Sequence, residues 1–329
     1  MSLLNVEDLK TYYTTLRGPV KAVDGVSFTV EKGEATGLAG ESGCGKTTVA
    51  SSILRVLPSN GNIVGGKIMY KSSVNIASID EEVMRTDIRW KEISIVFQGA
   101  MNALNPVFKV GDQIIEAITL HEPNVSRKEA LDRAQKLMEL VGVEPSRVNN
   151  YPHEFSGGMK QRAMIAMALA SNPSLLIADE PATALDVIVA AQVLKLLKEL
   201  KKNLDLGMIL ITHDLSIIAE LCEKTAIMYA GKIAEYGDVV TVFKNPMHPY
   251  TQGLMSSFPS IDAKERMRMV SIPGVPPDLL NPPMGCRFHT RCKFAMDICR
   301  KKEPAYLELE KGHFVSCHMV MSIYEGKKW

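Results

Sequence analysis

The stretch GESGCGKTT, residues 40–48, decides the fold of this chain. Its spacing of two glycines followed by lysine and threonine is that of a phosphate-binding loop. Glycines let backbone N–H groups curl around a phosphate, Lys46 reaches the β- and γ-phosphates, and the Thr47 hydroxyl binds Mg²⁺. We expect every residue of the loop to contact the nucleotide: Gly40, Glu41, Ser42, Gly43, Cys44, Gly45, Lys46, Thr47 and Thr48.

The segments around this loop predict the fold class. A strand-like run at residues 34–40 precedes the loop, and a helical pattern at residues 47–57 follows it. Two short apolar runs, residues 174–181 and 207–214, predict buried parallel strands joined by a crossover helix. The pattern is typical of an α/β fold of the P-loop NTPase class.

A pair of carboxylates closes the first of these runs, LLIADEP. Beside a phosphate-binding loop, one carboxylate holds Mg²⁺ while its neighbour orients or deprotonates the attacking water. We therefore expect Asp179 to serve the bound nucleotide and its metal, and Glu180 to be catalytic.

Five further elements occur in an order that resembles ABC-type ATPases. FSGGMKQR, residues 155–162, lies between the loop and the carboxylates and resembles the signature motif of that family. The other matches are Tyr13 to the aromatic residue that stacks on adenine, Gln98 to the lid glutamine, Asp186 to the D-loop and His213 to the switch histidine.

This resemblance implies a RecA-like core with an antiparallel β subdomain and a helical subdomain at about residues 99–168. It also implies a head-to-tail dimer that sandwiches ATP, in which Ser156, Gly157 and Gly158 of one subunit contact the γ-phosphate bound to the other. A helix that opens with Ser-Gly-Gly offers free N–H groups to an anion, which agrees with this role.

The resemblance also assigns the chemistry. Glu180, His213 and Gln98 are the expected catalytic residues, and Gln98 joins Thr47 at Mg²⁺. The signature departs from the common family pattern at Phe155 and Met159, and the D-loop begins with Ala184 in place of serine.

Two more stretches narrow the family. Residues 98–106, with a glutamine followed by Leu-Asn-Pro, and the triplet His248-Pro249-Tyr250 resemble the ATPase subunits of dipeptide, oligopeptide and nickel importers. That implies a homologous second ATPase subunit, two membrane permease subunits and, indirectly, a solute-binding protein, at the cytoplasmic face of the membrane. Which solute is carried stays open.

Composition agrees with these partners. The net charge of +1 gives no reason to expect nucleic acid, no apolar run is long enough to span a bilayer, and the N-terminus does not resemble a signal peptide. The alternative function is a soluble ABC-type ATPase with a metal- or redox-sensing role, suggested by the cysteines alone.

Four cysteines crowd the C-terminal tenth of the chain: Cys286, Cys292, Cys299 and Cys317. In a reducing compartment such a group indicates metal more than disulfides. It lacks the tight Cys pairs of structural zinc sites, and wider spacing suits an iron–sulfur cluster. The family resemblance implies a [4Fe–4S] cluster, while zinc, with His289, His313 or His318 as rival ligands, and free thiols remain alternatives.

A change of composition near residue 260 predicts the domain boundary. Segments 245–260 and 272–285 are rich in proline and glycine. We expect a nucleotide-binding domain at 1–260 and a C-terminal extension with the four-cysteine metal site at 261–329, where the metal would staple a segment that has little apolar core.

Overall fold

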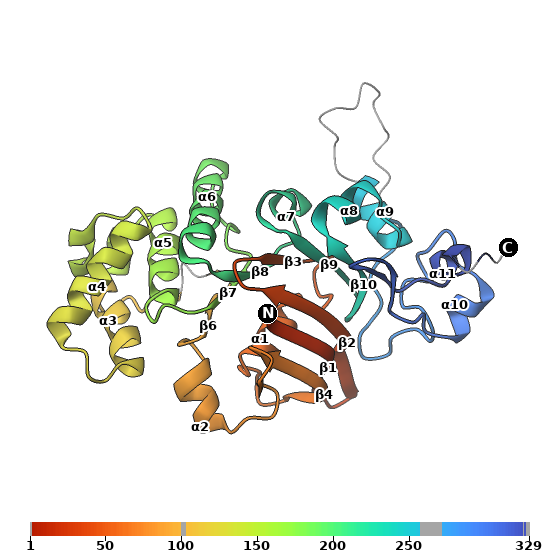
Figure 1. The fold of residues 1–329 in the computed structure, drawn as a ribbon, viewed down its shortest axis with the longest axis horizontal. Helices are drawn as coiled ribbons and strands as arrows, with labels where there is room; N and C mark the ends of the chain where they lie inside the picture. Colours follow the sequence, from red (N-terminus) through yellow and green to blue (C-terminus); the bar gives the residue numbers. More distant parts are fainter. Residues whose placement is uncertain (1, 100–102, 257–271, 325, 327–329) are drawn as a thin grey trace. The chain divides into compact units, whose positions relative to one another are not determined.

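The structure is a computed structural model that describes residues 2–99, 103–256, 272–324 and 326. They form two compact units (Figure 1). The first is centred on Tyr70–Ile211 and includes Val30–Ala35, and the second comprises Asn5–Thr29, Thr36–Met69 and the chain from Thr212 onward.

The first unit is built on parallel strands covered by helices. Strand β7 (Leu175–Asp179) lies between β6 (Ile93–Val96) and β8 (Gly207–Ile211), and every residue of the three is buried. Continuous burial explains their unbroken apolar sequences. The predicted crossover helix between β7 and β8 is confirmed as α6 (Val187–Leu204).

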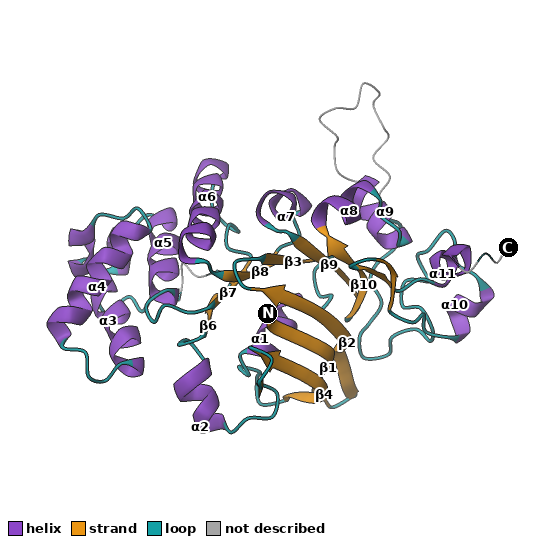
Figure 2. Cartoon of the chain, in the orientation of Figure 1, coloured by secondary structure: helices purple, strands orange, loops and turns teal. Residues whose placement is uncertain are grey.

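Of the other helices of this unit, α3 (Val110–His121), α4 (Arg127–Leu140) and α5 (Gly157–Ala168) lie beside one another in Figure 2, and the short α2 (Glu81–Val83) lies apart from them. A capping box of Ser126 and Glu129 starts α4, and Gly142 follows its end with φ +72°.

The second unit contains two sheets. In the first, β1 (Ser2–Thr15) lies between β2 (Gly18–Glu31) and β4 (Gly61–Tyr70). In the second, β3 (Ala35–Ala39) pairs in parallel with β9 (Lys224–Tyr229), which forms a hairpin with β10 (Lys232–Asp238). Three short helices of this unit lie along the chain before the tail: α1 (Lys46–Ile53), α7 (Leu215–Leu221) and α8 (Val239–Lys244).

The C-terminal segment continues this second sheet. Strand β12 (His313–Val315) pairs with β10, with Val315 opposite Glu235, and β11 (Leu307–Glu310) pairs with β12. Helices α10 (Asp297–Lys301) and α11 (His318–Tyr324) flank this hairpin.

The proline- and glycine-rich segment 245–260 contains a helix that its composition did not predict. Pro249 starts helix α9 (Pro249–Ser256), since proline lacks only an N–H that a first helical turn leaves unbonded anyway. The strands β11 and β12 were not predicted either, because they are short and three of the four residues of β11 are exposed. The predicted boundary near residue 260 lies outside the described residues.

Across the described ranges, none of the helices has the length and apolar character needed to cross a membrane.

Candidate nucleotide-binding site

The loop of residues 40–45 joins β3 to α1 in the second unit, as predicted. Its glycines are required: a Cβ on Gly40 would lie 2.1 Å from the carbonyl oxygen of Met228, and one on Gly45 would lie 2.2 Å from that of Ala22. Gly43 has φ +77°, a conformation that other residues adopt at a cost. The backbone is thus fixed in the curl that presents its N–H groups.

Lys46 lies inside this curl. Its side chain is buried, and Nζ donates to the carbonyl oxygens of Gly40 at 2.7 Å and Glu41 at 3.1 Å. The Cys44 thiol is buried beside it, 3.6 Å from Nζ, and burial raises the pKa of this thiol. A buried thiol of raised pKa fills space and is a poor nucleophile. Thr47, the expected Mg²⁺ ligand, is exposed at the start of α1.

Of the two neighbouring tyrosines, Tyr13 is the one beside the loop. Its hydroxyl lies 3.2 Å from Oγ1 of Thr48 in the first turn of α1. Tyr12 instead donates to Asp24 at 2.7 Å, and burial raises the pKa of its hydroxyl to about 12. Tyr13 stays the predicted adenine-stacking residue.

Two side chains from the C-terminal part of the chain contact the loop at Glu41. The hydroxyl of Tyr250 accepts from the Glu41 backbone N–H at 3.0 Å. The guanidinium of Arg291 holds the Glu41 carboxylate with two hydrogen bonds of 2.7 Å and 3.0 Å. The sequence did not predict that either residue contacts the loop. Neither His-Pro-Tyr nor the residues around Arg291 form a pattern that indicates a contact about 200 residues or more away.

The first unit brings together Gln98, Glu180 and Thr183. Oε2 of Glu180 accepts from Nε2 of Gln98 at 3.3 Å and from the Thr183 hydroxyl at 2.8 Å. Glu180 has φ +47°, and its N–H donates to the carbonyl oxygen of Ile211. The carboxylate is therefore aimed by a constrained backbone at the end of β7, directly after the buried Asp179.

The signature residues start α5 as expected. Ser156 is the N-cap, and its hydroxyl accepts from the Met159 N–H at 3.4 Å. Gly158 is required by packing as well, since a Cβ there would lie 2.4 Å from Cγ1 of Val189 on α6. Asp186 caps α6 by accepting from the N–H groups of Ile188 and Val189.

His213 is exposed after the end of β8, two residues before α7 begins. It belongs to the second unit with Tyr13 and the phosphate-binding loop, whereas Gln98, the signature, Asp179, Glu180 and Asp186 belong to the first.

The four C-terminal cysteines line one enclosed cavity together with His289 and His318. Burial, with a smaller contribution from the three neighbouring cysteines, raises the pKa of the Cys286 thiol to about 12. However, no group of three or more His, Cys, Asp or Glu side chains in the described ranges is arranged to hold a metal ion.

Known proteins resemble this chain along most of its length. A family profile described as ABC transporter matches residues 23–183, and another, described as oligopeptide/dipeptide transporter, C-terminal region, matches residues 234–299. The dipeptide transport ATP-binding protein DppD of Caldanaerobacter subterraneus is 42% identical over 318 residues, which cover 96% of this chain and 97% of the relative. The oligopeptide transport ATP-binding protein OppD of Bacillus subtilis is 45% identical over 316 residues, 95% of this chain and 87% of the relative.

A solved structure extends the likeness to the fold. A dimeric ATP-binding cassette in a post-hydrolysis state, bound to ADP and Pi, matches with a TM-score of 0.63 and 25% identity, over 72% of this chain and 98% of that chain. This confirms the predicted α/β P-loop fold, and none of these relatives supports the alternative of a soluble metal or redox sensor. The chain belongs to the ABC transporter ATP-binding proteins that carry the oligopeptide/dipeptide transporter C-terminal region.

Proposed function

We propose that this chain is the ATP-hydrolysing subunit that powers a membrane importer of dipeptides or oligopeptides. The observation that carries the proposal is that both of its regions, the cassette and the C-terminal region, match the peptide transport proteins over nearly their whole length. The constrained phosphate-binding loop and the aimed Glu180 carboxylate are the parts that such an ATPase needs.

The site residues take the following roles in this proposal. The loop N–H groups and Lys46 bind the phosphates, Tyr13 stacks on adenine, and Thr47 and Gln98 hold Mg²⁺, with Asp179 beside it. Mg²⁺ supplies charge neutralisation at the β- and γ-phosphates. Glu180 polarises the attacking water, and Gln98 orients that carboxylate by its hydrogen bond to it. His213 contacts the γ-phosphate as the switch residue.

The partner in this proposal is a homologous ATPase subunit. Ser156, Gly157 and Gly158 at the start of α5 contact the γ-phosphate bound to the partner, while Asp186 lies at the dimer contact. ATP closes the dimer because each nucleotide then has donors on both subunits, and loss of phosphate reopens it. The dimer lies at the cytoplasmic face of the membrane, where two membrane permease subunits convert this motion into transport.

Reconstitution tests the proposal. The chain is co-expressed with the homologous ATPase and permease genes, and the purified complex is placed in liposomes. We expect its ATPase rate to rise when a peptide-loaded solute-binding protein is added, and labelled peptide to accumulate only with ATP. The proposal would be overturned if the chain purified without a permease and its ATPase rate did not change when the loaded binding protein was added.

We further propose that the four cysteines hold a [4Fe–4S] cluster that staples the C-terminal extension of residues 261–329. The support is that four thiols line one cavity at the end of a segment with a small apolar cluster. A zinc ion would need its thiolates at about 2.3 Å from the metal. A cluster takes the same four cysteines around a larger core.

Metal analysis under anaerobic conditions tests this second proposal. We expect a brown protein with about four iron and about four sulfide per chain, and loss of both in a Cys299→Ser variant. The matched control is Cys222→Ser, which changes a buried cysteine outside the group. One zinc per chain without sulfide would contradict the cluster.

A further inference from the structure

The phosphate-binding loop carries a carboxylate whose charge works against its ligand. Glu41 follows Gly40 directly, and a free carboxylate on a loop that binds phosphates repels them. In the structure this carboxylate is held by both terminal nitrogens of Arg291, in the bidentate geometry that gives the strongest pairing of these groups. The Arg291 side chain is 5% exposed and that of Glu41 is 26% exposed, so solvent only partly screens the pair.

Arg291 is itself fixed from several sides. Its Nε donates to the carbonyl oxygen of Pro273 at 2.8 Å, and its guanidinium lies 5.7 Å from the centre of the Tyr229 ring. Tyr229 packs against Tyr250 and against Phe288, with ring centres 4.7 Å and 5.1 Å apart. Arg291 is thus positioned by a hydrogen bond to Pro273 and by the packed ring of Tyr229.

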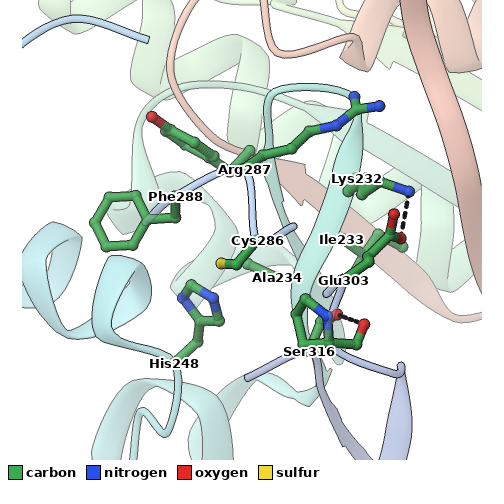
Figure 3. Close-up of a pocket in the computed structure, with 11 residues that line it drawn as sticks. Lys232, Ile233, Ala234, His248, Cys286, Arg287, Phe288, Glu303 and Ser316 are labelled. Atoms are coloured by element: carbon green, nitrogen blue, oxygen red, sulfur yellow. Dashed lines mark hydrogen bonds and ion pairs between the residues drawn. The ribbon is translucent and has the colours of Figure 1, made fainter. Parts of the chain in front are cut away.

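A second arginine of the same segment contacts residues next to the loop. Figure 3 shows Arg287 extending past Lys232 of β10. It is buried and donates to the carbonyl oxygen of Ala230 and to the carboxylate of Asp24. Gly231, the residue after Ala230, donates its N–H to the carbonyl oxygen of Cys44 in the phosphate-binding loop at 2.9 Å. Arg291 therefore connects the cysteine-bearing segment to the loop directly, and Arg287 does so through Ala230 and Gly231.

We infer that Arg291 is a positioning residue for nucleotide binding, which neutralises Glu41 and so makes the affinity of the phosphate-binding loop depend on the four-cysteine segment. Arg291 directly precedes Cys292, one of the thiols that line the cavity, so the order of that segment decides whether the arginine reaches Glu41. The inference rests on the proposed function, since it takes ATP as the ligand of the loop.

The test is a charge cycle at the two residues in the full-length protein. Binding of a fluorescent ATP analogue and the ATPase KM and kcat are measured for Arg291→Ala, Arg291→Lys, Glu41→Gln and the double variant of Glu41→Gln with Arg291→Ala. The control is Arg300→Ala, an exposed arginine of the same segment. Near-ultraviolet circular dichroism checks that each variant is folded.

The expected signs differ between the variants. Arg291→Ala weakens binding about tenfold and raises KM more than it lowers kcat, because it leaves a carboxylate beside the phosphates. Arg291→Lys falls in between, since lysine cannot form the paired contact. Glu41→Gln binds nucleotide about threefold more tightly than wild type, and the double variant recovers most of the affinity lost in Arg291→Ala.

Three outcomes overturn the inference. Equal affinity for wild type and Arg291→Ala removes the role of Arg291. Weaker binding in Glu41→Gln, Arg291→Ala and the double variant alike indicates mechanical support without charge neutralisation. If neither wild type nor Arg300→Ala binds the analogue, the proposed ATPase function fails and the inference fails with it.

Discussion

The backbone and the hydrogen bonds of Glu180 orient its carboxylate. Its left-handed backbone and its bonds to Gln98 and Thr183 fix the direction of one carboxylate at a strand end. A non-glycine residue in this conformation costs free energy, and such strain is found where a side chain must be aimed. The strain therefore supports the catalytic role expected from the sequence.

Replacing that carboxylate should separate binding from hydrolysis. Glu180→Gln keeps the size of the side chain but cannot accept a proton, so we expect the rate of ATP hydrolysis to fall by about 10²–10⁴-fold while ATP still binds. Phosphate release and binding of a fluorescent ATP analogue measure the two effects. Glu139→Gln, an exposed carboxylate on α4, is the control and should hydrolyse ATP as wild type does.

His248 makes stability depend on pH. Complete burial lowers its pKa from 6.5 to about 4, and its Nδ1 accepts from the N–H of Tyr250, which requires the neutral ring. The unfolded chain takes up this proton near pH 6.5 and the folded chain does not until about pH 4. The free energy of unfolding therefore falls as the pH drops through this window, by up to ~3 kcal/mol.

A variant without this titration should lose that part of the slope. In His248→Asn we expect a flatter dependence of unfolding free energy on pH between 6.5 and 4 than in wild type. Urea unfolding at several pH values measures both. Identical slopes for the two proteins would show that His248 titrates normally in the folded state.

Helix α5 packs on helix α6 at Gly158, the second glycine of the signature. The space at Gly158 is filled by Val189, whose own N–H is held by Asp186 at the start of α6. The signature and the D-loop are therefore joined by direct packing within the first unit.

Overfilling this contact should lower stability. Gly158→Ala places a methyl group 2.4 Å from Val189 Cγ1, and we expect a loss of about 1–3 kcal/mol, seen as a lower melting temperature. Adding Val189→Ala should restore most of it, because the smaller side chain vacates the space. A double variant no more stable than Gly158→Ala would contradict the packing argument.

Elements with strong local signals were predictable from the sequence. The crossover helix α6 was expected because helix periodicity shows in nearby residues. Strands β7 and β8 were expected because burial on both faces demands apolar runs. The strands β11 and β12 were not, because a three- or four-residue strand gains its pairing from a distant neighbour and shows no pattern of its own.

For the whole molecule, the C-terminal segment is joined to the sheet that carries the nucleotide loop. Its strand β12 pairs with β10, and the buried His313 contacts the buried Glu235 at 2.7 Å. Glu235 also accepts from the N–H groups of Met247 and His248. A buried carboxylate that loses these donors is costly.

Truncation should therefore destabilise what remains. In a chain that ends at Ser256 we expect the melting temperature to fall by more than about 5 °C, since Glu235 loses His313, and Asp24 loses Arg287. Differential scanning calorimetry of the two chains measures this. An unchanged melting temperature, with a separate transition for the C-terminal segment in the full chain, would instead support an extension that folds by itself.

The sequence by itself determined the phosphate-binding loop, the carboxylate pair, the signature and the family, because these depend on residue types at short fixed spacings. Only the tertiary structure decided that the four-cysteine segment reaches the loop, with Arg291 on Glu41 across 250 residues. The physical reason is the strand order: β3 leads into the loop, β9 pairs with β3, β10 with β9, and β12 with β10. Sheet pairing of this kind brings distant segments together through backbone hydrogen bonds, which leave little trace in the local sequence.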